Sequence, residues 1–237
     1  MSVCCAHINA LREELERRLH QGVRALKAAT QEVLGNRRRL ASYILERLRQ
    51  DGIHPTCIVD HGCGTGTTAV AFAKLAPDAK VYGTDVKSHR ASISTPANVE
   101  FRAIEPCRLR HEGLRPDVVL VSGVLHHIAR ASEDAFLADI AEAMPPHARL
   151  FVHEHRLATH RFRQAIEKAL LRRLEVLGGI EHMSRFYNYY TRARLVDLLK
   201  THGFEIIEMQ DVEGRFVTLP TLNGNMLLYC ERRASSR

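Results

Sequence analysis

The stretch CIVDHGCGTG, residues 57–66, decides the fold expected for this chain. An apolar run ends in an acid, Asp60. Three glycines follow at alternate positions: Gly62, Gly64 and Gly66. Glycine adopts positive φ and lets a ligand lie against bare backbone, and a helix starting near Thr67 would offer unpaired N–H groups and a partial positive charge. The stretch therefore predicts a buried strand, a tight ligand-binding turn and a helix.

The spacing of the glycines separates two kinds of cofactor site. A dinucleotide fingerprint, G-x-G-x-x-G, needs a third glycine that packs helix on strand, and here that place falls at Thr67. The carboxylate of Asp60 instead suits a ligand that carries an ammonium group. The D-x-G-x-G-x-G arrangement, with Cys63 inside the turn, resembles motif I of the class I S-adenosylmethionine-dependent methyltransferases.

The segments that follow extend this resemblance. KVYGTD, residues 80–85, predicts a second strand that ends in Asp85, an acid placed to take both ribose hydroxyls. The resemblance further implies that Val86 and Glu105 contact the cofactor, Glu105 through the adenine amino group at the end of a third strand. DVVLVSGVLHHI, residues 117–128, resembles the family's motif IV region. The resemblance implies that Ser122 and Gly123 face the methionine part of the cofactor.

Strands alternate with helices from about residue 57 to the end of the chain, which favours an α/β fold with a doubly wound, mostly parallel sheet. The last two strands, expected at 204–212 and 225–232, have no helix between them. An antiparallel final strand fits this, and the resemblance implies the seven-stranded Rossmann-like methyltransferase sheet. Residues 86–98 predict a loop or single turn where that family usually has a helix.

Two helical additions flank the core. Residues 1–50 predict an N-terminal cap of two helices, the second over 37–49 with Asn36 as its N-cap. The methyltransferase domain proper is then 51–237, with 156–190 inserted after the fifth strand as a substrate cap. Tyr187 and Tyr190 of that insertion offer apolar walls and hydroxyl groups to a substrate. Plain packing on the core, or a homodimer contact of the N-terminal helices, remains an alternative.

The ionisable groups at the ends of the fourth and fifth strands are candidates for chemistry, because ligands of such sheets lie beyond the carboxyl ends of the strands. His127 and His155 are the candidate general bases, since imidazole titrates near neutrality. His126 and Glu154 are candidate substrate contacts. Each histidine could instead pack on the cofactor or bond the backbone. We expect no metal site, because His153 and His155 alternate on a strand with no clear partner ligand.

The composition of the chain limits the classes of binding partner that we expect. The 237 residues carry a formal net charge of +7, which suits an anionic small substrate. Nucleic acid is not expected, because the basic clusters lack interleaved aromatic residues. Six scattered cysteines without metal spacing suggest reduced thiols, and the N-terminus shows neither a signal-peptide pattern nor a membrane span, so we expect a cytoplasmic protein.

The sequence thus predicts an enzyme that transfers a methyl group from S-adenosylmethionine to oxygen or nitrogen of a small metabolite or biosynthetic intermediate, releasing S-adenosylhomocysteine. Two alternatives stay open. An RNA or protein methyltransferase would need a basic groove continuous with the cleft. A cofactor-binding but inactive subunit would bind cofactor without admitting an acceptor.

Overall fold

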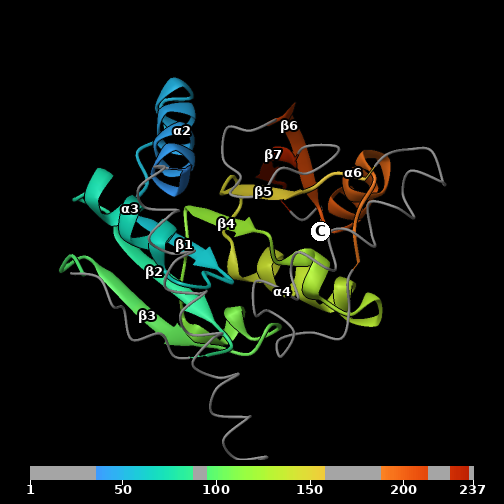
Figure 1. The fold of residues 1–237 in the computed structure, drawn as a ribbon, viewed down its shortest axis with the longest axis horizontal. Coiled ribbons are helices and arrows are strands. Elements are labelled where there is room, and N and C mark those ends of the chain that lie inside the picture. Colours follow the sequence, from blue (N-terminus) through green and yellow to red (C-terminus); the bar gives the residue numbers. More distant parts are fainter. Residues whose placement is uncertain (1–35, 88–94, 158–187, 213–224, 235–237) are drawn as a thin grey trace, which may run out of the picture.

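A single mixed sheet of seven strands forms the centre of the protein (Figure 1). The computed structural model describes residues 36–87, 95–157, 188–212 and 225–234. The strands are β1 (Cys57–His61), β2 (Lys80–Asp85), β3 (Val99–Ala103), β4 (Val118–Ser122), β5 (Arg149–His155), β6 (Phe204–Asp211) and β7 (Asn225–Arg232). Their order is β3-β2-β1-β4-β5-β7-β6, and β7 runs antiparallel to both neighbours while the other pairs are parallel. The predicted fold class is confirmed.

Helices cover both faces of the sheet. α2 (Asn36–Gln50) and α3 (Thr67–Leu75) lie on one face, and α4 (Glu133–Ala143) and α6 (Arg192–Thr201) lie on the other. Three short 3-10 helices complete the described elements: η1 (Leu109–Glu112), η2 (Leu125–His127) and η3 (Arg130–Ser132). None of the described helices is long and apolar enough to cross a membrane.

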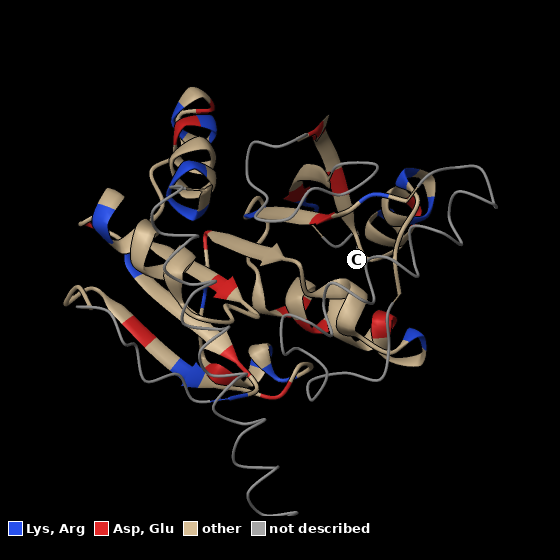
Figure 2. Ribbon diagram, viewed as in Figure 1, with Lys and Arg blue, Asp and Glu red and all other residues tan. Residues whose placement is uncertain are grey.

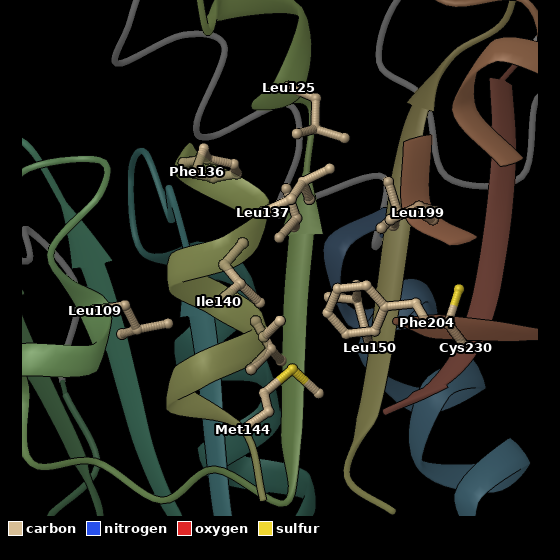
Figure 3. Close-up of a cluster of buried hydrophobic side chains, with 14 of the residues drawn as sticks. Leu109, Leu125, Phe136, Leu137, Ile140, Met144, Leu150, Leu199, Phe204 and Cys230 are labelled. Atoms are coloured by element: carbon tan, nitrogen blue, oxygen red, sulfur yellow. The ribbon is translucent and has the colours of Figure 1, made fainter. Parts of the chain in front are cut away.

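The strands are apolar on both faces because each face has its own helical layer. Successive side chains of a strand point to opposite sides, so Ile58 packs with α2 and α3 whereas Val59 packs with α4. In β5, Phe151 faces the α2 layer and Leu150 the α4 layer in the same way. Figure 3 shows part of the second layer, with side chains of α4 lying against the strands. This two-sided burial explains the near-continuous apolar runs of β1 and β4.

The helix expected over 37–49 is present and already includes Asn36, the first residue that the structure describes. Asn36 is its first residue and is buried, so the structure assigns Asn36 to the helix and not to the cap position that we expected. Leu40, Ile44 and Leu48 are fully buried against the sheet and α3. The other end of the helix is tied to the sheet by Arg47, whose Nε donates to Glu208 of β6 at 2.7 Å. α2 is therefore part of the core.

The third strand is shorter than expected. It ends at Ala103, because the N–H of Ile104 donates to the carbonyl of Asp85 at 2.8 Å and the side chain of Ile104 turns into the core. Glu105 follows in a loop with its side chain exposed. The first predicted helix of the N-terminal cap, the helix within 156–190 and residues 88–94 of the short loop lie outside the described residues.

Replacing Ile44 by alanine tests whether α2 belongs to the core. The substitution removes apolar atoms from a fully buried position and should lower the free energy of unfolding by about 2–5 kcal/mol in urea denaturation. Ser42→Ala, on the exposed side of the same helix, is the matched control and should change it by less than about 0.5 kcal/mol. Equal, small effects of both substitutions would show a dispensable cap.

Candidate active site

The glycine-rich turn after β1 is built as the sequence predicts. Gly62, Gly64 and Gly66 have φ values of +77°, +55° and +74°, which only glycine adopts without strain. The N–H groups of Gly62 and Cys63 both donate to the carbonyl of Thr84 on β2, at 2.7 and 3.0 Å. A side chain at Gly62 would also collide with Val124, whose Cγ2 would lie 2.3 Å from the new Cβ. The turn is therefore held tightly between β2 and the loop after β4.

Asp85 closes the same turn from the end of β2. Its Oδ2 accepts a hydrogen bond from the N–H of Gly64 at 2.9 Å, and the residue is 7% exposed. The next residue, Val86, is 43% exposed although it is apolar. These are the acid that we expected to bind the ribose and the neighbouring residue that the resemblance implies as a cofactor contact.

Asp60 holds an unsatisfied acceptor. The residue is 2% exposed, and the N–H of Ala69 donates to its carboxylate. Oδ2 is buried and has no hydrogen-bond partner among the described residues. Burial raises the pKa of Asp60 to about 7, against the opposing charge of Arg37. A buried acceptor without a donor is costly, so this oxygen fits a ligand that brings N–H groups.

Arg37 is a site residue that the sequence analysis missed. Its Nη1 donates to Oγ of Ser122 at 3.1 Å, and its charge acts on both Asp60 and His153. Burial lowers the pKa of this guanidinium. Arg37 was visible in the sequence only as one of three consecutive arginines, and Figure 2 shows that α2 carries several basic residues. Arg37 differs from its two neighbours because its position on a helix packed against the sheet brings its side chain to Ser122.

Glu154 anchors the loop after β4, which corrects the expectation that it is a substrate contact. Oε1 accepts from the N–H groups of Val124 and Leu125, both at 2.8 Å, and Oε2 pairs with Nδ1 of His126 at 2.7 Å. The residue is 1% exposed. Burial alone would raise the pKa of Glu154, but the hydrogen bond and charge of His126, with the neighbouring histidines, lower it overall. Both oxygens are therefore occupied by the chain itself.

Four rings meet at this loop. The centroid of His126 lies 4.0 Å from that of His127, 5.1 Å from that of His155 and 5.5 Å from that of Tyr189. His127 and His155 are half-buried, whereas His126 is 2% exposed. The structure thus brings together both candidate bases and the residue assigned to the substrate.

The fifth strand contributes a second polar group on the face toward α2. Nδ1 of His155 lies 2.9 Å from Oδ1 of Asn225, and Nδ2 of Asn225 lies 3.3 Å from Nε2 of His153. Nδ1 of His153 in turn lies 3.0 Å from Oγ of Ser122. Burial and the charge of Arg37 lower the pKa of His153 to about 3, so this imidazole is neutral and serves as a connector. Asn225 was the second residue that the sequence analysis missed.

Tyr190 does not line a pocket, contrary to expectation. It is fully buried in the α4 layer, where its hydroxyl donates to Glu133 at 2.7 Å. Asn188, two residues before Tyr190 in the expected insertion, contacts the loop after β4, since its N–H donates to the carbonyl of His126 at 2.7 Å. Tyr187 lies outside the described residues.

Two further candidate cofactor contacts are Cys63 and Gly123. Cys63 is half-buried, and burial raises the pKa of its thiol, which argues against a reactive thiolate in the turn. Gly123, with φ +66°, turns the chain away from β4, and its N–H donates to the carbonyl of His153 at 2.8 Å. Within the part of the chain that the structure describes, no three His, Cys, Asp or Glu side chains gather as metal ligands.

Comparison with known proteins identifies the class. The methyltransferase domain family matches residues 33–209, well over half of the chain. The chain therefore belongs to this family, and it is a class I S-adenosylmethionine-dependent methyltransferase. Among curated proteins, no sequence matches significantly.

Solved structures share the fold. The 1,6-didemethyltoxoflavin-N1-methyltransferase of Burkholderia thailandensis, solved with its acceptor and S-adenosylhomocysteine, is 20% identical, with a TM-score of 0.64 over 99% of this chain and 92% of that one. Human N-acetylserotonin methyltransferase, in complex with S-adenosylmethionine, is 19% identical, with a TM-score of 0.60 over 91% and 57% of the two chains. The magnesium protoporphyrin IX methyltransferase of Synechocystis, with bound S-adenosylhomocysteine, is 20% identical, with a TM-score of 0.57 over 83% and 84%.

Proposed function

We propose that this enzyme methylates an oxygen or nitrogen atom of a small metabolite or biosynthetic intermediate after a histidine removes the acceptor's proton. The observation that carries the proposal is the juxtaposition of two polar groups at one sheet edge. Asp60 keeps a buried, unpartnered oxygen beside the glycine turn, and imidazoles gather at the ends of the neighbouring strands β4 and β5. The first suits the cofactor and the second suits an acceptor that must lose a proton.

The residues around the glycine turn fit S-adenosylmethionine, which supplies a methyl group on a sulfonium when bound. Asp60 would take its ammonium group and Arg37 its carboxylate, because the two side chains interact electrostatically and carry opposite charges. Asp85 would bind the ribose, and Val86 and Glu105 would border the adenine. Backbone at the turn and at Ser122–Gly123 would complete the site: Gly62, Cys63, Gly64, Gly66, Ser122 and Gly123.

Three imidazoles are candidates for removing the proton. His155 and His127 are half-buried and remain the proposed bases. His126 forms a pair with Glu154, and a carboxylate stabilises the protonated form of an imidazole. His153 is set apart, because its pKa near 3 and its contacts on both ring nitrogens leave it no role as a base near neutral pH.

The substrate class rests on composition and on the structural neighbours. The three neighbours described above are named for small acceptors, and the formal net charge of +7 suits an acceptor with negative charge. The residues between β5 and α6 and those before α2 are the segments that we propose to cover this acceptor. The described residues on either side of the first segment are Leu157 and Asn188. The N–H of Leu157 donates to the carbonyl of Tyr190, and the N–H of Asn188 donates to the carbonyl of His126.

The Arg37 assignment predicts a selective loss of affinity. Arg37→Ala should weaken binding of S-adenosylhomocysteine by about 1.5–3 kcal/mol in isothermal titration, the scale of hydrogen bonds to charged groups. Binding of 5′-methylthioadenosine, which lacks the amino-acid part, should stay unchanged. Arg38→Ala, the exposed neighbour, is the control. Equal losses for both ligands would place Arg37 outside the carboxylate site.

The Asp60 assignment predicts a pH dependence of binding. The pKa of Asp60 is raised to about 7, and the ligand's ammonium group needs the ionised form, so binding must expel a proton below pH 7. Affinity for S-adenosylhomocysteine should therefore rise about tenfold per pH unit up to pH 7 and then level off. Asp60→Asn should bind weakly with no such slope. The same slope with 5′-methylthioadenosine would assign it to another group.

The base is tested with S-adenosylmethionine and a panel of hydroxylated and amino-substituted aromatic acceptors, following formation of S-adenosylhomocysteine. For an acceptor that turns over, alanine at the true base should lower turnover by roughly 10²–10⁴ with cofactor affinity intact, and the wild-type rate should fall at acid pH as the imidazole is protonated. His126→Ala, His127→Ala and His155→Ala are compared with the exposed control His54→Ala. A flat pH profile with three active variants would reduce catalysis to placement of the acceptor.

A further inference from the structure

Asn225 occupies a buried position at the junction of two strands. It begins β7, is 2% exposed and pairs with His155 in the antiparallel register of β5 and β7. Directly opposed residues of two strands point to the same face. Asn225 therefore shares with His155 the face toward α2.

This face carries a polar row at its carboxyl edge. One position deeper in each strand, it is apolar: Ile58, Leu120, Phe151 and Leu227 all lie in the cluster under α2 and α3. The next residue on the same face, two further along the chain, is polar in three strands: Asp60 in β1, Ser122 in β4 and His153 in β5. In the antiparallel strand β7 the corresponding polar residue is Asn225, two positions before Leu227. Asp60 lies opposite Leu120 and His153 opposite Leu227, so the row is staggered; it includes Asp60 at the cofactor turn and Asn225 in β7.

The amide of Asn225 contacts two imidazoles, with its nitrogen toward His153 and its oxygen toward His155. His153 is neutral, so its ring carries one proton. Its Nε2 faces the amide nitrogen of Asn225 at 3.3 Å, which is a donor, so Nε2 must accept and the ring proton must lie on Nδ1, toward Oγ of Ser122. Oγ of Ser122 accepts from Arg37 as well. With its NH₂ group committed to His153, Asn225 presents Oδ1 to Nδ1 of His155.

An amide oxygen can only accept, so neutral His155 must carry its proton on Nδ1 and its lone pair on Nε2. We propose that Asn225 is the positioning residue of the site: it selects this tautomer of His155 and so makes Nε2 the basic nitrogen. The catalytic meaning of this inference rests on the proposed function, whereas the tautomer itself does not.

Besides Asn225, charged and titratable groups also surround His155. Among the residues that the structure describes, the charges of Glu154 and His153 interact with His155, and the rings of His126 and Tyr189 lie near it. His127 lies against His126, and Arg156, the residue that follows β5, pairs with Asp211 of β6. The carboxylate of Glu154 accepts from His126, from the loop N–H groups and, at 3.3 Å, from the backbone N–H of His155. The contact of Oδ1 of Asn225 at 2.9 Å acts on Nδ1 alone and so discriminates between the two ring nitrogens.

The experiment is an NMR measurement on the full chain, labelled with ¹⁵N-histidine and saturated with S-adenosylhomocysteine. Long-range ¹⁵N–¹H correlations report which ring nitrogen is protonated, and the His155→Gln spectrum assigns the signal. We expect the Nδ1–H form in the wild type and a mixture of both tautomers in Asn225→Ala. Asn225→Asp places a carboxylate at Nδ1 and should move the midpoint of the His155 titration upward by about one pH unit.

Asn98→Ala is the matched control, because the amide of Asn98 contacts backbone carbonyls at the opposite edge of the sheet. It should leave both the tautomer and the titration of His155 unchanged. An Nε2–H form in the wild type, or an unmoved midpoint in a folded Asn225→Asp, overturns the proposal, and the wild-type spectrum alone decides if that variant fails to fold. If His155→Ala keeps its turnover while the tautomer is as expected, the base assignment fails and the positioning by Asn225 stands.

Discussion

The buried carboxylate of Glu154 determines the course of the chain after β4. A charge at 1% exposure needs donors on both oxygens. Two of them are backbone N–H groups of the turn after β4, the third is His126, and the backbone N–H of His155 adds a longer contact at 3.3 Å. Since β4 and β5 are parallel neighbours, the carboxylate can reach the turn only if the turn folds back over the end of β5. This constraint places η2, gathers the histidines and gives Asn188 a backbone carbonyl on which to dock.

Two of the buried carboxylates of the site, Glu154 and Asp60, have pKa values shifted in opposite directions. Glu154 has its donors from the chain, and its pKa is lowered. Asp60 has one backbone donor and an orphaned oxygen, and burial raises its pKa to about 7. A protein that needed Asp60 only for its own stability would have supplied a second donor or replaced the acid. We infer from this difference in hydrogen bonding that Glu154 stabilises the fold of the site, whereas Asp60 serves to bind a ligand.

The sequence predicts the parts of this arrangement that depend on local pattern. Apolar runs and glycines predict β1, its turn and α3, and the alternation of strands with helices predicts the sheet. Arg37 and Asn225 escape this reasoning because their partners are distant: Arg37 meets Ser122 across 85 positions, and Asn225 meets His155 across 70. Neither residue type is unusual where it stands. The prediction for Tyr190 was wrong because it relied on local sequence: the aromatic residues beside it suggested a pocket wall. In the structure its hydroxyl donates to Glu133 in the core.

The polar row along the α2 face also explains the composition of α2. A helix over a purely apolar face would need an apolar inner stripe along its whole length. Here Leu40, Ile44 and Leu48 cover the apolar part of the sheet, whereas Arg37, one turn before Leu40, reaches the edge where Ser122 and Asp60 lie. Moving Arg37 along the helix would bury a guanidinium against leucines, at a cost of several kcal/mol. The start of α2 is therefore fixed by the cofactor edge and its remainder by the core, so we infer that this helix works as a wall of the catalytic domain and that a boundary at residue 50 would divide one functional unit.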